Sequence, residues 1–271
     1  MGGSMRRSIA NVLAGGYMLA LYGFIFLPVA VLVLFSFKDG RFPIPPFTGP
    51  SLRWYRAVLD DPRLVEALVN SGLVAVGSSL VATLLGFLAA YGLSRYRLPG
   101  SALQRFVLTV PLTVSYLVIG LGLLIVANAV GFPRSLLAVG IGHVVINLPL
   151  CFSIIYASMG EHQRNVERAA RDLGAGEASV LALVTAPMLA PAILAAFFLA
   201  VTFSWDEFII AFLLTRFDVT LPVEIWSLLR SGLNPKTNAV GSIVFLVSVA
   251  LVLALELLVF RRLTPKPKDA G

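Results

Sequence analysis

Six long apolar segments constrain this chain more than any other feature of its sequence. A hydrocarbon core of about 30 Å requires about 20 apolar residues in a helix. Backbone polar groups in lipid must be satisfied internally, and no alternating barrel pattern occurs, so each segment is predicted to be a membrane-spanning helix. The six predicted spans are about Val12–Phe37, Ala67–Leu93, Leu103–Val130, Leu136–Met159, Pro187–Leu214 and Ala239–Phe260.

The composition predicts an all-α integral membrane protein with one membrane domain. The 271 residues are 58% hydrophobic and 13% charged, which leaves too little charge to cover a water-soluble surface. We therefore attribute the net charge of +7 to basic residues at a membrane face and not to binding of nucleic acid. Residues 1–4 are interpreted as vector-derived, 5–263 as the membrane domain and 264–271 as a cytoplasmic tail.

The distribution of basic residues predicts that both termini lie in the cytoplasm. Six spans place the two termini on the same side of the membrane. Twelve of the 21 Lys and Arg residues lie at the termini and in the loops of that side, and an excess of this kind favours the inner side. Several spans are expected to be in contact with lipid.

A long loop at about Lys38–Glu66 is then expected on the outer side. Its prolines exclude a long helix at its start, whereas SLRWYRAVL predicts a short helix capped by Ser51. Two interpretations are open for this loop. Its aromatic residues either sit at the membrane interface or form a docking surface for an external partner.

A short charged segment interrupts the apolar sequence between the fourth and fifth spans. In VERAARDLGAG, apolar residues recur at helical spacing; they are Val166, Ala169, Ala170 and Leu173. Opposite charges at i,i+4 predict two ion pairs on the polar side, Glu167 with Arg171 and Arg168 with Asp172. Gly174 is predicted to end the helix in the left-handed conformation that only glycine adopts cheaply.

This amphipathic helix either lies on the membrane surface or docks on a partner protein. A helix that lies on the membrane surface with solvated charges is common. However, two alanines bury little area in lipid, whereas they let the backbone of a partner approach closely. The loop at about 160–186 is also long for a simple connector. We therefore favour a helix that docks on a partner.

Two adjacent carboxylates in the fifth predicted span are candidates for the substrate pathway, because ionisable groups at membrane depth are costly. Asp206 and Glu207 lie about 20 residues after Pro187, which places them roughly 30 Å along a continuous helix. Asp206, beside Trp205, is expected to face the pathway, where a carboxylate and an aromatic ring suit an extended ammonium cation. The alternative is an interfacial pair that caps a neighbouring helix. The candidate pathway residues are Thr202, Trp205, Asp206 and Glu207.

Several stretches resemble one family of membrane transport proteins. AARDLGAGEASVLALVTAP resembles the signature loop of binding-protein-dependent ABC importer permeases, and NSGLVAVGSSLVATLLGFLAAYGLSRYRLPG is similar to their second and third membrane segments. FSWDEFIIAFLLT and LPVEIWSLLRSGLNPKTNAVGSI look like the second permease subunit of spermidine/putrescine importers. One departure is that Arg168 occupies the family's glutamate position, with Glu167 one residue earlier.

The resemblance implies a type I ABC importer permease fold with six spans and a coupling helix that docks on a cytoplasmic ATPase. The residues that carry this docking are Glu167, Arg168, Ala169, Ala170, Arg171, Asp172 and Gly174. The implied partners are a second permease subunit in a heterodimer, two copies of the ATPase and an external binding protein. ATP and magnesium would bind in the ATPase, since this sequence contains no G-x-x-x-x-G-K-[ST] phosphate loop.

The sequence also leaves rival functions open. Related importers carry ferric iron, phosphonates or opines. A secondary transporter, driven by an ion gradient, would show inverted repeats, discontinuous helices and charges near the midplane. A membrane anchor without transport would give the two carboxylates of the fifth span no role. We find no metal-ligand cluster and no catalytic set in the sequence, so the chain is not expected to be an enzyme or to hold a cofactor.

Overall fold

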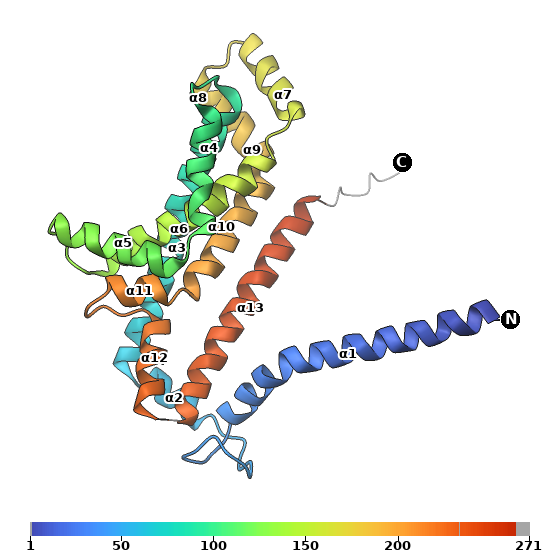
Figure 1. Cartoon of the computed structure of the whole chain (residues 1–271), viewed down its shortest axis with the longest axis vertical. Coiled ribbons are helices and arrows are strands. Elements are labelled where there is room, and N and C mark those ends of the chain that lie inside the picture. The colour runs from blue at the N-terminus through green and yellow to red at the C-terminus, as the bar shows by residue number, and fades with distance from the viewer. Residues whose placement is uncertain (1, 233, 264–271) are drawn as a thin grey trace, which may run out of the picture. The chain divides into compact units, whose positions relative to one another are not determined.

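A computed structural model of the protein describes residues 2–232 and 234–263, so the predicted tail at 264–271 lies outside the described residues. Every regular element in the described ranges is helical (Figure 1), which confirms the all-α prediction. Four helices are long and apolar enough to cross a membrane. They are α1 (Gly2–Ser36), α3 (Pro62–Arg95), α6 (Leu136–Ala157) and α13 (Pro235–Leu263).

The third and fifth predicted spans are broken, and the prediction of continuous helices there was wrong. The segments Ser101–Thr113 and Tyr116–Ala129 meet at 107°, and Glu177–Met188 meets Ala190–Trp205 at 74°. If each bent pair counts as one span, the described residues hold up to six. Proline is the common cause, because its ring removes a backbone donor and clashes with the preceding turn. Pro111 lies in the first break, and Pro191 lies in the first turn of the helix after the second.

The remaining helices are short. Three of them make up the first bent pair and four make up the second, while the others lie in loops or after a break. They are α2 (Arg53–Leu59), α4 (Ser101–Thr109), η1 (Val110–Thr113), α5 (Tyr116–Ala129), α7 (Glu161–Asp172), α8 (Glu177–Ser179), the π-helical η2 (Val180–Thr185), α9 (Ala186–Met188), α10 (Ala190–Trp205), α11 (Ile209–Leu214) and α12 (Leu221–Ser231).

The chain divides into two compact units, Met1–Pro62 with Ile225–Leu246 and Arg63–Glu224 with Val247–Gly271. In the first unit, side chains tie the loop at about Lys38–Glu66 to its short helix α2. The indole nitrogen of Trp54 donates to the Lys38 carbonyl at 2.9 Å, and the Ser36 and Tyr55 hydroxyls lie 2.7 Å apart. The predicted short helix therefore forms and packs within its own loop.

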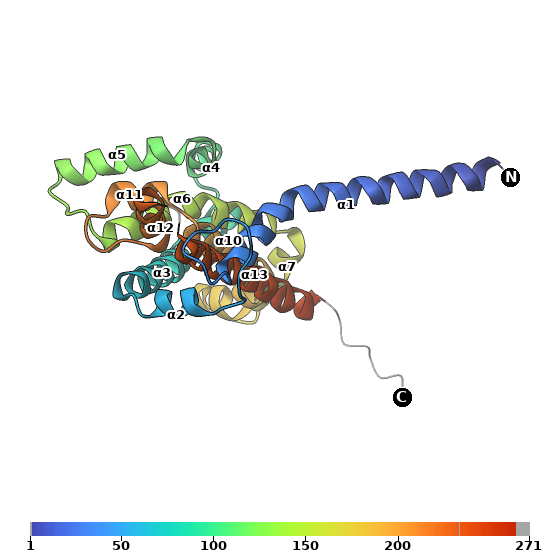
Figure 2. The ribbon, with the colours of Figure 1, turned by 90° about the horizontal axis from the view of Figure 1, so that it is seen from below.

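The second unit holds the core that positions the candidate sites. One apolar cluster packs α3, α6 and α10 together around Phe152 and the fully buried Cys151. A second cluster joins α11 to α5 and α6 through Ile210 and Leu214, and Figure 2 shows these three helices side by side. The broken segment after α10 is therefore seated against two other helices of the unit.

Close packing of α3 on α6 predicts a strong effect of a single methyl group. A Cβ added at Gly86 would lie 2.8 Å from the Phe152 backbone nitrogen and 2.9 Å from the Cys151 Cβ, both too close for the backbones to stay in place. We expect Gly86→Ala to destabilise the unit by about 1–3 kcal/mol. The thermal midpoint of the purified protein in detergent measures this. Gly72→Ala, on the same helix with no atom within 4 Å of the added Cβ, should leave the midpoint unchanged or raise it; equal shifts would contradict the packing argument.

Candidate functional site

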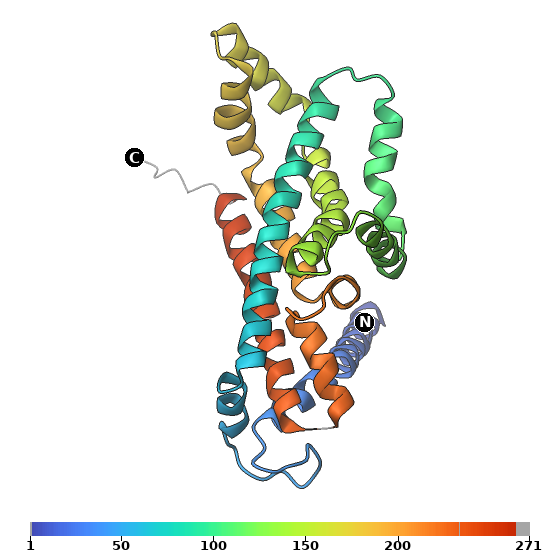
Figure 3. The same cartoon turned by 90° about the vertical axis from the view of Figure 1, so that its left-hand side faces the viewer.

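The predicted charged helix is α7, which lies at one end of the second unit beside the C-terminal end of α3 (Figures 1 and 3). The Gln163 side chain accepts a hydrogen bond from the Gly160 backbone N–H at 3.1 Å and so fixes the start of the helix. Gly174 has φ +91° and its N–H donates to the Arg171 carbonyl at 2.8 Å. The helix therefore ends at the glycine in the left-handed conformation, as predicted.

Glu167 on α7 is fully buried and joins three elements of the unit. Arg95 at the end of α3 donates from Nε to Oε2 at 2.6 Å and from Nη2 to Oε1 at 3.0 Å. The Thr185 hydroxyl of η2 donates to Oε1 at 3.0 Å. The side chains of Arg95 and Glu167 are 6% and 0% exposed, so this bidentate ion pair is shielded from water. We call Arg95, Glu167 and Thr185 the buried clamp.

The predicted ion pairs along α7 were wrong. Glu167 pairs with Arg95, 72 positions earlier, and not with Arg171. Arg171 instead forms an ion pair with Glu177 at 2.9 Å. In the described residues, no ion pair joins Arg168 to Asp172, and both are exposed. Helical spacing shows which residues are neighbours on one helix, but it does not show a partner on another helix.

A second polar cluster, more exposed than the buried clamp, holds the turn after α7. Glu177 accepts hydrogen bonds from Arg171 at 3.0 and 3.1 Å and from the Tyr96 hydroxyl at 2.8 Å. Arg171 also donates to the Tyr91 hydroxyl of α3 at 3.0 Å. The hydrogen bond to Glu177 raises the pKa of Tyr96 above its usual value, because it stabilises the neutral phenol. Tyr96 therefore stays a donor at any physiological pH.

The outward face of α7 has no covering within the described chain. Arg168, Ala169 and Asp172 are exposed, and the Leu173 side chain is 90% exposed. Val166 and Ala170 are half-buried. Of the predicted apolar face, then, the inner half packs against this chain and the outer half does not.

The carboxylates of the fifth predicted span do not lie on a continuous helix. Because α10 ends at Trp205 and α11 begins at Ile209, Asp206 and Glu207 occupy the break between them. The continuous helix that was predicted from Pro187 through both carboxylates is therefore not found. The two carboxylates have different environments, one exposed and one buried.

Glu207 caps the helix that follows the break. Its carboxylate accepts hydrogen bonds from the Ile210 N–H at 2.9 and 3.0 Å and from the Ala211 N–H at 3.1 Å. Only 6% of the residue is exposed. A carboxylate at a helix N-terminus is stabilised by unpaired amides and by the helix dipole. A capping carboxylate, the alternative that the sequence left open, is thus found at Glu207, although the capped helix is α11, which follows it directly, and not a neighbouring helix.

Asp206 lines an open hollow of about 550 Å³ together with three aromatic residues, Tyr116, Phe203 and Phe208. Thr202 lines the same hollow, and its hydroxyl donates to the Phe198 carbonyl at 2.9 Å. Trp205, by contrast, is only 7% exposed, so its ring is packed inside the unit. The structure thus brings Thr202, Asp206 and Glu207 to the lining of one hollow, whereas Trp205 does not line it.

Sequence reasoning missed the aromatic lining of this hollow. Phe203 and Phe208 lie close to the two carboxylates in the sequence TFSWDEF. Their closeness in sequence is the signal that could have identified them. Tyr116 comes from the start of α5, far away in the sequence, and no local pattern marks it. The three rings replace Trp205 as the aromatic partners of Asp206.

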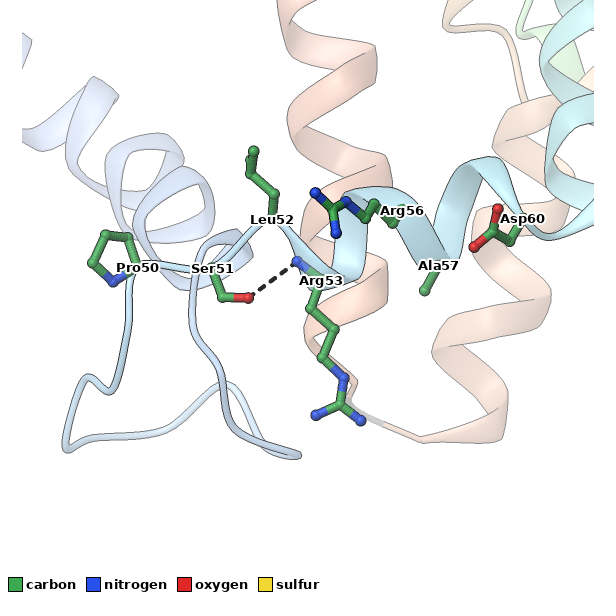
Figure 4. A pocket seen from close by; sticks show the side chains of 7 residues that line it. All are labelled: Pro50, Ser51, Leu52, Arg53, Arg56, Ala57 and Asp60. Atoms are coloured by element: carbon green, nitrogen blue, oxygen red, sulfur yellow. Dashed lines mark hydrogen bonds between the residues drawn. The ribbon is translucent and has the colours of Figure 1, made fainter.

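A second hollow, of about 680 Å³, lies at α2 in the first unit. Figure 4 shows that the Arg53 and Arg56 side chains on its wall point away from each other. Arg53 lies 3.9 Å from Asp39 and stacks on the Trp54 ring, with 5.3 Å from its guanidinium carbon to the ring centroid. The two cations therefore do not converge on a small anion, and the feature is a basic surface rather than a ligand pocket.

Apolar helices with two broken spans, a hollow lined by aromatic rings and two carboxylates after α10, and a clamped surface helix are what an integral membrane transport subunit would show. Residues 82–266 match the model of the family described as binding-protein-dependent transport system inner membrane component. The chain belongs to this family and is a permease subunit located in the inner membrane.

Curated relatives over most of the chain are permeases named for polyamines. The putrescine transport system permease protein PotI of Escherichia coli (strain K12) is 35% identical over 234 residues, which cover 83% of each chain. The spermidine/putrescine transport system permease protein PotC of the same strain is 29% identical over 252 residues, with 92% of this chain and 95% of the relative covered. A more distant relative, the sulfoquinovosyl glycerol transport system permease protein SmoH of Agrobacterium fabrum, is 29% identical over 204 residues.

Solved structures share the fold at low sequence identity. A chain of a bacterial ABC transporter involved in the import of the acidic polysaccharide alginate aligns with a TM-score of 0.66 and 19% identity, over 95% of this chain and 97% of that chain. A chain of the alginate transporter in complex with a pentasaccharide-bound periplasmic protein aligns with a TM-score of 0.69 and 14% identity, over 93% and 94% of the two chains. The predicted type I ABC importer permease fold is confirmed.

Family membership also decides between the rival classes. Discontinuous helices, expected of a secondary transporter, occur in this chain at two places. Helix continuity therefore does not separate the two classes. The family match and the shared fold do so, because both are those of binding-protein-dependent importers.

Proposed function

We propose that this chain forms half of the translocation pathway of an ATP-driven importer for a polyamine such as spermidine or putrescine. The observation that carries the proposal is the exposed Asp206 among three aromatic rings at the break after α10. An ammonium group is attracted both to a carboxylate and to the faces of aromatic rings. The polyamine names of the relatives at 29% and 35% identity support the same substrate class.

In this proposal α7 is the coupling helix that docks on a separate cytoplasmic ATPase. Leu173 and Ala169 are exposed on the outward face of α7, while the buried clamp holds the inward face to α3 and η2. A protruding leucine beside a small alanine suits insertion into a cleft of a partner. ATP and magnesium would bind in two ATPase copies, whose closure shifts the membrane domain between inward-open and outward-open states. Both termini then lie in the cytoplasm.

The remaining proposed partners are a second permease subunit, an external binding protein and the membrane lipid. A second permease subunit completes the pathway, because this chain forms one half of it. The two subunits are proposed to form a heterodimer. The basic surface at α2, with Arg53 and Arg56 on different sides, offers contacts to an external binding protein that presents acidic side chains. The membrane lipid surrounds the apolar spans.

Substrate and energy source are tested separately. The cognate binding protein is screened by calorimetry against spermidine, putrescine, ferric iron, a phosphonate and an opine. We expect the two polyamines alone to bind, and binding of another compound with no response to polyamines would overturn the substrate assignment.

Copurification of an ATPase with the tagged permease, and its loss when Leu173 is replaced by Asp, tests the docking assignment. An unchanged yield of ATPase with this variant would overturn it.

A further inference from the structure

A buried chain of polar side chains connects three helices to the break after α10. His143 of α6 is 1% exposed, and its Nδ1 lies 2.5 Å from the Ser204 hydroxyl of α10. Its Nε2 lies 3.3 Å from Oε2 of Glu207. The Ser204 hydroxyl lies 3.2 Å from the Ser78 hydroxyl of α3. The chain of contacts therefore runs from Ser78 through Ser204 and His143 to the carboxylate that caps α11.

The direction of the hydrogen bonds follows from the acceptors. The carboxylate oxygens of Glu207 accept N–H groups from the first turn of α11. In the tautomer of His143 that carries its proton on Nε2, the N–H faces Glu207 and Nδ1 accepts from the Ser204 hydroxyl. Ser204 in turn can accept from Ser78. Each buried polar group in the chain thus has a role as donor or acceptor.

The Nε2 side of the His143 ring faces Glu207. In the described residues, Nε2 has no well-aligned hydrogen-bond partner, and the nearby carboxylate is the polar group that it faces. A buried imidazole nitrogen without a partner costs free energy. If Glu207 left the cap, the amides of α11 would lose their acceptor, and His143 Nε2 would lose the carboxylate that it faces. The cap and the imidazole therefore stabilise each other.

We propose that His143 is a positioning residue for transport: it holds Glu207 as the cap of α11 and thereby fixes the break that presents Asp206 to the hollow. Asp206 precedes the cap directly, so any shift of Glu207 moves its backbone. Glu207 is then a structural partner of His143 and not a second substrate carboxylate. This inference rests on the proposed role of Asp206 in the pathway.

The functional test compares His143→Leu with His143→Gln in the complete transporter, after assembly has been verified by copurification. Gln places an amide N–H near the position of Nε2, so we expect it to retain uptake, whereas Leu should lower uptake by roughly tenfold. The factor should be the same for a diamine and a triamine, because no substrate contact is lost. In a Glu207→Gln background, His143→Leu should cause little further loss. Independent, multiplicative losses, or a changed ratio of diamine to triamine uptake, would overturn the proposal.

A labelling experiment reads the geometry without transport. Cys151 is the free cysteine of the chain and is buried, so Cys151→Ser provides the background. Asp206→Cys reports the break through its rate of reaction with a positively charged methanethiosulfonate, and Leu59→Cys on α2 is the control site. We expect His143→Leu to change the rate at position 206 several-fold while His143→Gln and the control site stay the same. An unchanged rate at 206 with reduced uptake would contradict positioning.

The test still decides if His143→Leu fails to assemble or if the parent complex takes up no polyamine. If His143→Leu does not assemble, His143→Gln and His143→Asn carry the test, because Asn replaces the Nδ1 side of the ring and not the Nε2 side. The proposal then expects the labelling rate at position 206 to be retained with Gln and changed with Asn, and the reverse would overturn it. If the parent complex takes up no polyamine, the proposed function fails, whereas the labelling rates still decide on the positioning role of His143.

Discussion

Glu167→Ala should abolish coupled transport, with the largest loss of stability of any single change at α7. The substitution leaves the Arg95 guanidinium buried without its counter-charge and removes the acceptor of the Thr185 hydroxyl. Removal of one partner of a buried ion pair costs about 3–5 kcal/mol. We expect α7 to detach from α3, so that the ATPase either fails to copurify or hydrolyses ATP without uptake. Thermal unfolding of the purified permease measures the first effect, and ATPase activity with uptake measures the second.

The neighbouring position provides the matched control. Arg168 occupies the place at which the family pattern has glutamate, yet its side chain is exposed. Arg168→Ala should change the stability of the permease by no more than about 0.5 kcal/mol, although it can weaken docking of the ATPase. A larger loss of stability with Arg168→Ala than with Glu167→Ala would contradict the buried clamp. Arg95→Ala should give the same loss as Glu167→Ala, because it breaks the same pair from the other side.

Asp206→Asn should reduce polyamine uptake by roughly 10- to 100-fold while the complex still assembles. A hydrogen bond to a charged group contributes about 1.5–3 kcal/mol of binding free energy. The amide of Asn keeps the shape of the Asp206 side chain but removes its charge. Asp206 is exposed in the hollow, so the fold should tolerate the change. Initial rates of radiolabelled putrescine and spermidine uptake in cells give the readout, with protein amounts checked by immunoblot.

An exposed carboxylate outside the hollow serves as the control for Asp206. Asp218 lies in the loop after α11 and does not line the hollow. Asp218→Asn changes the net charge by the same amount, and we expect uptake near the level of the unmodified protein. Unchanged uptake with Asp206→Asn, or equal losses with both variants, would remove Asp206 from the pathway.

Hydropathy was sufficient to predict the continuous membrane-spanning helices, because their length is set by the thickness of the membrane. Four predicted spans correspond to the continuous helices α1, α3, α6 and α13. The breaks at Pro111 and after Glu177–Met188 were missed, because proline inside an apolar run is also common in continuous membrane helices. Only the packing of neighbouring helices shows which prolines end a helix.

The candidate sites show the same division between local and distant information. The end of α7 at Gly174 could be predicted from one residue, since a left-handed turn favours glycine. The partners of Glu167 and Glu207 could not, because Arg95 and His143 come from other helices. A single sequence carries no record of such contacts. As a result, the sequence could not separate the cap Glu207 from the exposed Asp206.

The central claim is that this permease carries a polyamine inward at the expense of ATP. Proteoliposomes that contain the purified complex, with ATP and magnesium enclosed on the ATPase side and the binding protein with radiolabelled spermidine or putrescine on the other, test it most directly. We predict accumulation of label that requires ATP and the binding protein, and that falls by roughly 10- to 100-fold with Asp206→Asn. Accumulation driven by an ion gradient without ATP, or ATP-dependent uptake of another substrate with none of either polyamine, would contradict it.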